Sequence, residues 1–141
     1  MLVRGTDPQA ERLLRSGFLG AEPRSAACLA CGRALALRAP AFLRETALGV
    51  SERALTAVEA LDHARDAAGL EEVLANGGNE EARAAALRSL ARTGRIAGPE
   101  LAALAASAPS ARLRQEARRA LTPAVAEPAA ELPRASDGAA Q

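Results

Sequence analysis

The feature that most constrains the fold is a helical pattern in which a small residue is followed four positions later by leucine. The pattern occurs four times, and its leucines are spaced 26, 29 and 31 residues apart. The pairs are Cys31 with Leu35, Ala57 with Leu61, Ala86 with Leu90, and Ala117 with Leu121. An interval of four places both residues on one helix face, one turn apart. Such a face lets a similar helix approach closely, so we expect the repeats to stack.

Helix-start and helix-stop signals divide the chain into short helices. Prolines suit first helical turns, Ser and Asn cap helix starts, and Gly ends helices. We expect Ser51 to cap one helix, with Val50 and Leu55 forming a hydrophobic staple. No segment shows strand-like alternation of β-branched residues, which predicts an all-α fold. The expected helices cover residues 8–16, 23–38, 40–49, 51–64 and 68–75, and three more begin at Asn79, Gly98 and Ser110.

The composition predicts a shallow core made of stacked repeats. Apolar residues form 49% of the chain, but they include only two Phe and no Trp or Tyr. One repeat alone would bury too little area to offset the entropy of ordering it, at about 25 cal/mol per Å². The shortage of aromatic residues disfavours a deep pocket, and we expect no cofactor.

The segment NEEARAAALRSLARTG, residues 79–94, resembles the second helix of the short bacterial HEAT-like repeats. The matching features are a polar cap, an acidic lead-in, an arginine, a small-residue turn, a leucine and a glycine. They correspond here to Asn79, Glu80, Glu81, Arg83, Ala84, Ala85, Ala86, Leu90 and Gly94. A second segment, SARLRQEARRAL, keeps the order without the acidic lead-in or the glycine. The resemblance is best over residues 51–121 and weak over 1–50.

This resemblance implies a right-handed solenoid of HEAT-like helical hairpins over residues 1–121. HEAT-like proteins serve as scaffolds and adaptors, so it also implies a non-enzymatic module that binds another protein. Side chains outside the leucine seam would select that partner. The candidate partner-binding residues are Arg53, Glu59, Arg83, Arg88, Arg92, Arg114 and Arg118.

Enzyme chemistry has no support in the motifs. The chain has no phosphate-binding glycine loop, no nucleophile motif and no paired carboxylates at a plausible active site. His63 lies between Asp62 and Asp66 near an expected helix end, where a cation beside acidic neighbours stabilises the helix terminus. We therefore expect no catalytic residues.

Two alternative functions remain open. The last helix carries four arginines against one glutamate, so it could follow a phosphate backbone, as in HEAT-like DNA glycosylases. The balanced net charge of +1 gives no bulk attraction for nucleic acid, and we expect no nucleic-acid partner. The segment from Cys28 to Cys31 resembles a zinc-ribbon knuckle, which could support a zinc-dependent dimer; packing and redox roles are the other interpretations.

Residues 122–141 hold prolines at 123, 128 and 133 and have no apolar periodicity. This composition predicts a disordered tail. No window approaches the roughly eighteen consecutive apolar residues of a membrane span. With two cysteines that form no disulfide framework, these features predict a cytoplasmic protein without a membrane partner.

Overall fold

A computed structural model of the chain describes residues 8–122, and these residues form eight α-helices and no strand. The prediction of an all-α fold is confirmed for this part of the chain; the expected disordered tail lies outside it. The helices are α1 (Pro8–Gly20), α2 (Ala26–Arg38), α3 (Pro40–Ala47), α4 (Arg53–His63), α5 (Ala67–Asn76), α6 (Glu80–Arg92), α7 (Gly98–Ser107) and α8 (Ala111–Leu121). They divide into two compact units, one ending at Arg95 and the other beginning at Ile96.

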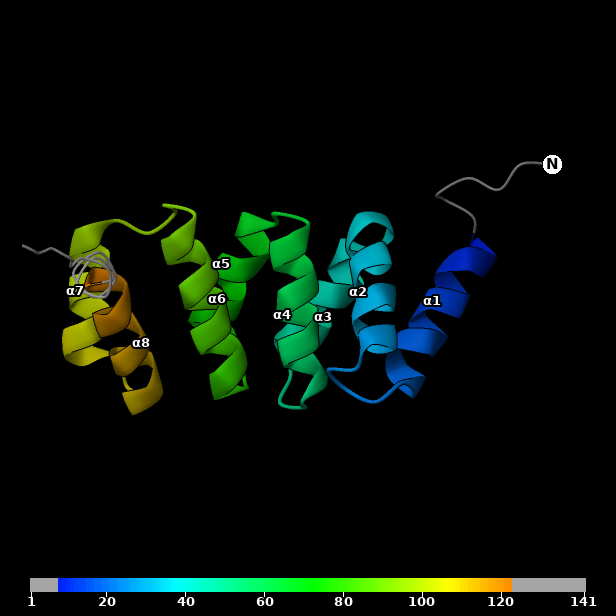
Figure 1. Cartoon of the computed structure of the whole chain (residues 1–141), viewed down its shortest axis with the longest axis horizontal. Helices are drawn as coiled ribbons and strands as arrows, with labels where there is room; N and C mark the ends of the chain where they lie inside the picture. The colour runs from blue at the N-terminus through cyan, green and yellow to red at the C-terminus, as the bar shows by residue number, and fades with distance from the viewer. Residues whose placement is uncertain (1–7, 123–141) are drawn as a thin grey trace, which may run out of the picture. The chain divides into compact units, whose positions relative to one another are not determined.

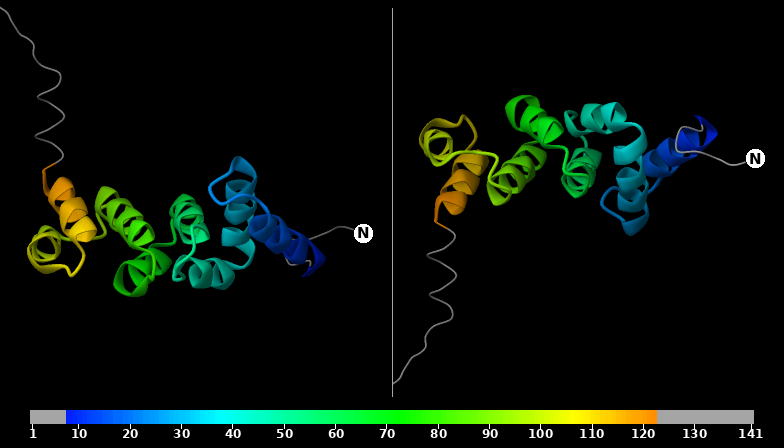
Figure 2. Two further views of the ribbon diagram at one scale, coloured as in Figure 1. Left: turned by 90° about the horizontal axis from the view of Figure 1, so that it is seen from below. Right: turned by 90° about the horizontal axis from the view of Figure 1, so that it is seen from above.

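The first unit consists of three helical hairpins packed in series. Helix α1 pairs with α2, α3 with α4, and α5 with α6. The second helices of the hairpins also contact one another, α2 with α4 and α4 with α6, while α3 contacts α5. Figures 1 and 2 show α2, α4 and α6 side by side in one layer and α3 and α5 in a second. Helix α4 is therefore packed by the equivalent helices α2 and α6 on both sides.

Side chains cap most of the second helices at their N-termini. Ser25, Asn79 and Ser110 each accept a hydrogen bond from the backbone N–H three residues later. These bonds satisfy N–H groups that have no partner inside the helix. The predicted caps at Asn79 and Ser110 are confirmed.

Helix α4 begins differently from the prediction. It starts at Arg53, and the Ser51 hydroxyl accepts from the N–H of Arg53 at 3.2 Å, in a local turn instead of a helix cap. Val50 is 79% exposed. The N-cap is thus Glu52, one residue after the predicted Ser51, and the predicted hydrophobic staple is wrong, because Val50 lies outside the helix packing.

Helix α1 continues past the glycine that was expected to end it. A Cβ added at Gly17 would lie 2.8 Å from the Cys31 sulfur, so the glycine lets α2 approach α1 closely. Tertiary packing thus decides the role of this residue, and the predicted end of the helix at Ser16 is wrong. Helix α2 starts at Ala26, three residues later than expected, where Ser25 supplies the cap.

The predicted leucine seam is confirmed in the first unit and wrong at its last member. Leu35, Leu61 and Leu90 are completely buried, whereas Leu121 is 42% exposed. Leu121 is the last residue of α8, while the other three leucines lie two or three residues inside their helices. A side chain at a helix end has less of its own helix and of the neighbouring helix around it.

An ion pair fixes the turn between α4 and α5. The Arg44 guanidinium donates two hydrogen bonds to the Asp66 carboxylate, at 2.7 and 2.6 Å. Asp66 also accepts from the N–H of Gly69 at 3.1 Å, which caps α5. The side-chain hydrogen bond from Arg44 is the main cause that lowers the pKa of the Asp66 carboxyl below its ordinary value, against the opposing effect of burial. The contact ties α3 to α5.

The second unit contains the α7–α8 hairpin. Leu101 and Ala105 of α7 and Leu113 and Ala117 of α8 are buried. Across residues 8–122, no helix combines the length and apolar character needed to cross a bilayer.

Candidate protein-interaction surface

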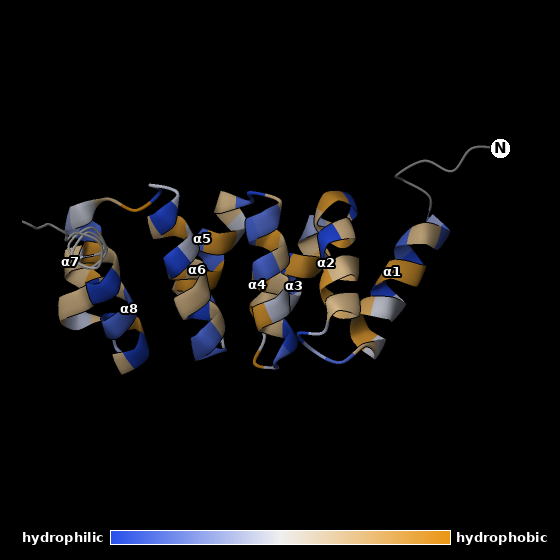
Figure 3. Ribbon diagram, viewed as in Figure 1, coloured by the Kyte–Doolittle hydropathy of each residue, from blue (hydrophilic) through white to orange (hydrophobic). Residues whose placement is uncertain are grey.

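A groove of about 340 Å³ lies between α4 and α6 in the first unit. Figure 3 shows hydrophilic residues on α4 and α6 facing the viewer, whereas α2, in the same layer, is coloured mainly in the apolar range. The groove has apolar residues from both helices and charged side chains around them. Its lining residues are Arg24, Leu55, Val58, Glu59, Asp62, Glu81, Ala85, Arg88, Ser89 and Arg92.

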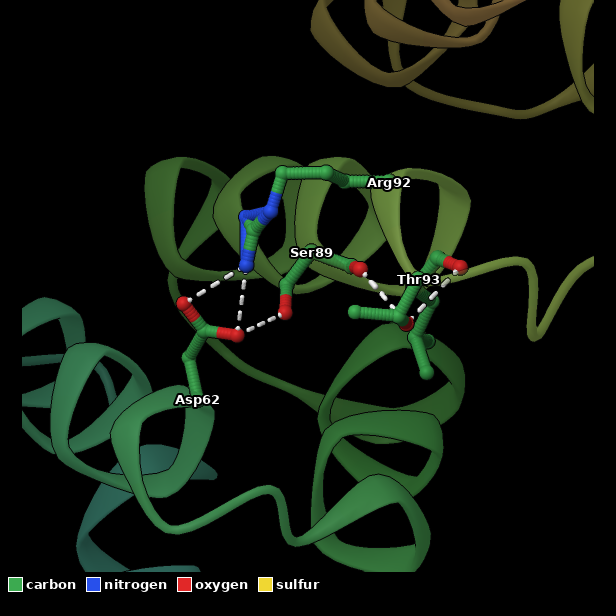
Figure 4. Close-up of polar contacts among 5 residues, drawn as sticks. Asp62, Ser89, Arg92 and Thr93 are labelled. Atoms are coloured by element: carbon green, nitrogen blue, oxygen red, sulfur yellow. Dashed lines mark hydrogen bonds and ion pairs between the residues drawn. The ribbon is translucent and has the colours of Figure 1, made fainter.

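A cluster of polar residues bridges α4 and α6 at one end of the groove. The Asp62 carboxylate of α4 accepts a short hydrogen bond from the Ser89 hydroxyl of α6. It also accepts from Nη2 of Arg92, at 2.9 and 3.0 Å to its two oxygens (Figure 4). Ser89 is only 4% exposed, and charge-assisted bonds of this kind are stronger than neutral ones. The cluster therefore holds the two helices at a fixed separation.

Another interhelix contact involves the loop before α2. Arg24 has φ of +73°, a left-handed conformation that is uncommon for residues other than glycine. Its N–H donates to the Thr56 hydroxyl of α4 at 2.9 Å. Its guanidinium lies 3.6 Å from the Glu59 carboxylate, and both side chains are substantially exposed. An exposed pair of this kind contributes little to stability and leaves both groups accessible.

The groove offers charges of both signs and no net formal charge. Glu59, Asp62 and Glu81 are acidic, and Arg24, Arg88 and Arg92 are basic. Leu55 and Ala85, which are half-buried, supply the accessible apolar surface, and the buried Val58 lies beneath it. Apolar surface with a few placed polar groups is typical of sites that recognise a protein segment.

Three of the sequence-predicted residues, Glu59, Arg88 and Arg92, lie together in this groove. Arg53 and Arg83 instead donate to backbone carbonyls. Nε of Arg53 donates to the Phe18 carbonyl at 3.1 Å, and Nε of Arg83 donates to the Leu74 carbonyl at 2.9 Å. Arginine side chains thus satisfy carbonyls near helix C-termini. The structure gives these two guanidinium groups an internal role.

The last two predicted residues lie in the second unit. Nη1 of Arg114 donates to the Ala108 carbonyl at 2.6 Å, and Nη2 of Arg118 donates to the Ala105 carbonyl at 3.3 Å. Glu116 is 4% exposed and lies 3.0 Å from Arg112. The arginines of α8 are therefore engaged within their own hairpin, which gives no support to a phosphate-binding helix.

Both cysteines pack against α1. Cys28 is completely buried, and its sulfur lies 3.3 Å from the Phe18 carbonyl, to which it donates. Cys31 is half-buried beside Gly17. No group of three or more His, Cys, Asp or Glu residues within 8–122 could hold a metal ion. Sharing a metal between two chains would require Cys28 to leave its contact with Phe18.

Sequence reasoning missed Asp62, Ser89 and Arg24 as parts of this surface. Asp62 was interpreted only as a neighbour of His63, and 27 residues separate it from Ser89. This separation is close to one repeat length, and each residue is next to a seam leucine, so the repeat could have indicated that the two residues lie close together. Arg24 gave no signal, because its left-handed backbone is set by the loop.

No protein-family model, curated protein or solved structure shows a significant match to the chain.

Proposed function

We propose that this chain is a non-enzymatic scaffold or adaptor, built as a right-handed solenoid of HEAT-like hairpins, that binds another protein in the cytoplasm. The groove between α4 and α6 supports the proposal most directly. It combines an apolar floor with accessible charges of both signs, held by the Asp62, Ser89 and Arg92 cluster. A segment of the partner would lie along the groove, its apolar side chains on Leu55 and Ala85 and its charges opposite Glu59 and Arg88.

A photo-crosslinking experiment tests this proposal. A photoreactive phenylalanine analogue would replace Leu55 in the groove or, as a control, Glu71 on the exposed surface of α5. After irradiation in the native cell, we expect one protein adduct from position 55 and not from position 71. Glu59→Arg should reduce that adduct because it inverts a charge of the groove. The same adducts from both positions, or none from position 55, would contradict the proposal.

The same protein should be titrated with labelled duplex DNA at low salt. The internal contacts of Arg114 and Arg118 predict weak binding. Tight binding that falls steeply with added salt would favour the DNA-binding alternative over the adaptor.

A further inference from the structure

A second hollow, which shares Asp62, Ser89 and Arg92 with the groove, opens where α4 and α6 end. It has a volume of about 580 Å³ and is open to solvent on one side. Arg65, Arg92 and Arg95 line it together with His63, while the leucines beneath it, Leu70 and Leu90, are 3% and 0% exposed. All the residues that line it belong to the first unit.

The pocket has a positive formal charge, unlike the groove. Its lining includes three arginines and one acidic residue, Asp62. Asp62 is held by Arg92 and Ser89 on the side shared with the groove. Arg65 and Arg95 are exposed, and within residues 8–122 neither guanidinium has a hydrogen-bond or ion-pair partner. Two positive charges are thus available to a ligand.

The backbone of Arg65 is a second, independent observation. Arg65 has φ of +60°, and the corresponding residue at the end of α6, Gly94, has φ of +74°. Glycine adopts this conformation without steric cost, whereas arginine does not. Any basic residue near the end of α4 would stabilise the helix terminus, so that role does not require arginine at the strained position. The conformation brings the Arg65 side chain to the pocket.

The carbonyls at the two helix ends, which would repel an anion, are largely satisfied. The Leu61 carbonyl accepts from the N–H of Asp66 at 3.0 Å, and the Leu90 carbonyl accepts from the N–H of Arg95 at 2.8 Å. The Asp62 carbonyl accepts from the N–H of Arg65 at 3.0 Å. These carbonyls thus have donors within the turns, and the guanidinium groups supply the positive charge of the pocket.

We propose that this pocket binds a small molecule carrying a phosphate monoester, with the phosphate between Arg65 and Arg95. A phosphate monoester carries a charge of about −1.5 to −2 at neutral pH, which matches two guanidinium groups better than a single carboxylate does. Each planar guanidinium can donate two parallel hydrogen bonds to phosphate oxygens. The two proposed phosphate contacts, Arg65 and Arg95, are not among the residues that line the groove.

The test uses the full chain, with phenyl phosphate as the probe and benzoate as the singly charged comparison. Binding is followed by the amide chemical shifts of Arg65, Thr93 and Arg95 in ¹H–¹⁵N spectra. We expect saturable shifts with a dissociation constant on the order of 1 mM, and weaker binding of benzoate. No saturable shift by about 20 mM phenyl phosphate, or equal binding of benzoate, would overturn the proposal.

Variants locate the site. Arg65→Gly keeps the left-handed turn and removes the guanidinium, so it should weaken phenyl phosphate binding about tenfold, and Arg95→Ala should act similarly. Arg12→Ala removes an exposed arginine of α1 and serves as the matched charge control. It should leave the affinity unchanged. Wild-type affinity in Arg65→Gly, or an equal loss in Arg12→Ala, would show that the phosphate does not bind between Arg65 and Arg95.

Discussion

The C-terminal ends of α4 and α6 have the same backbone geometry but different residues at the left-handed position. Arg65 follows α4 with φ of +60°, and Gly94 follows α6 with φ of +74°. In both turns the next residue donates its N–H to the buried seam leucine, Leu61 or Leu90. Ending the helix therefore requires only a positive φ, which glycine adopts most easily. Arginine at the α4 end keeps a strained backbone and adds a charge to a pocket.

The largest effect should come from the two seam leucines, which test whether α4 and α6 are equivalent. Leu61 and Leu90 are both completely buried, so Leu61→Ala and Leu90→Ala should each lower the free energy of unfolding by about 2–5 kcal/mol. Leu121→Ala is the control and should cost less than about 1 kcal/mol, because Leu121 is 42% exposed. Urea unfolding followed by circular dichroism measures all three. If only one of the two buried leucines lowered the free energy of unfolding by this amount, α4 and α6 would not be equivalent.

The next effect concerns the residues that follow the two turns, Asp66 and Arg95. Asp66→Ala removes both the cap of α5 and the ion pair with Arg44, at a cost of about 2 kcal/mol. Asp66→Asn keeps a capping oxygen and should cost about 1 kcal/mol. Arg95→Ala should change stability by less than about 0.5 kcal/mol, because the side chain is exposed. If Arg95→Ala destabilised the protein as much as Asp66→Ala, the side chain of Arg95 would stabilise its turn as Asp66 does, which would contradict this prediction.

The pH dependence gives the Asp66 prediction a second readout. The pKa of the Asp66 carboxyl is lowered in the folded protein, mainly by the hydrogen bond from Arg44. Its stabilising contribution is therefore complete above the ordinary carboxyl pKa of about 3.9 and is lost as the pH falls through the folded value. The stability difference between the wild type and Asp66→Asn should be constant near neutral pH and narrow below about pH 4. If the stability difference between the wild type and Asp66→Asn persisted at the lowest pH, the ion pair could not be its cause.

The smallest effect tests the left-handed positions themselves. A Cβ at Gly94 would meet no atom within 4 Å, so Gly94→Ala isolates the backbone strain and should cost about 1 kcal/mol. Arg65→Gly removes the corresponding strain. Glycine also raises the entropy of the unfolded chain, which offsets part of this gain. Arg65→Gly should therefore stabilise the protein by up to about 1 kcal/mol. Thermal unfolding measures both changes. A destabilised Arg65→Gly would mean that the arginine side chain contributes to folding and not only to the pocket.

Local signals in the sequence predicted the helices well. The caps at Asn79 and Ser110 and the end of α6 at Gly94 depend on a few neighbouring residues, and the structure contains all three. Asp66 carried the same kind of signal as a residue that favours N-cap positions, but the expected helix began too late to use it. Gly17 shows the opposite case, because contact with Cys31 overrides a local stop signal.

The groove was predicted only in part. Glu59, Arg88 and Arg92 could be expected on the outer face from their positions relative to the leucine seam, and the structure brings them together. Arg53 and Arg83 have the same spacing, but their guanidinium groups donate to carbonyls of other helices. Helical periodicity gives the face on which a residue lies and not the partner that its side chain finds.

The sequence by itself determined the all-α class, most helix starts and the burial of Leu35, Leu61 and Leu90, because caps and periodic apolar residues act within one helix. Only the tertiary structure decided that Asp62 bonds to Ser89 and that Arg44 bonds to Asp66. It also decided that Arg65 takes a left-handed conformation at a pocket. These contacts join residues from different helices, and their geometry depends on how closely the hairpins pack.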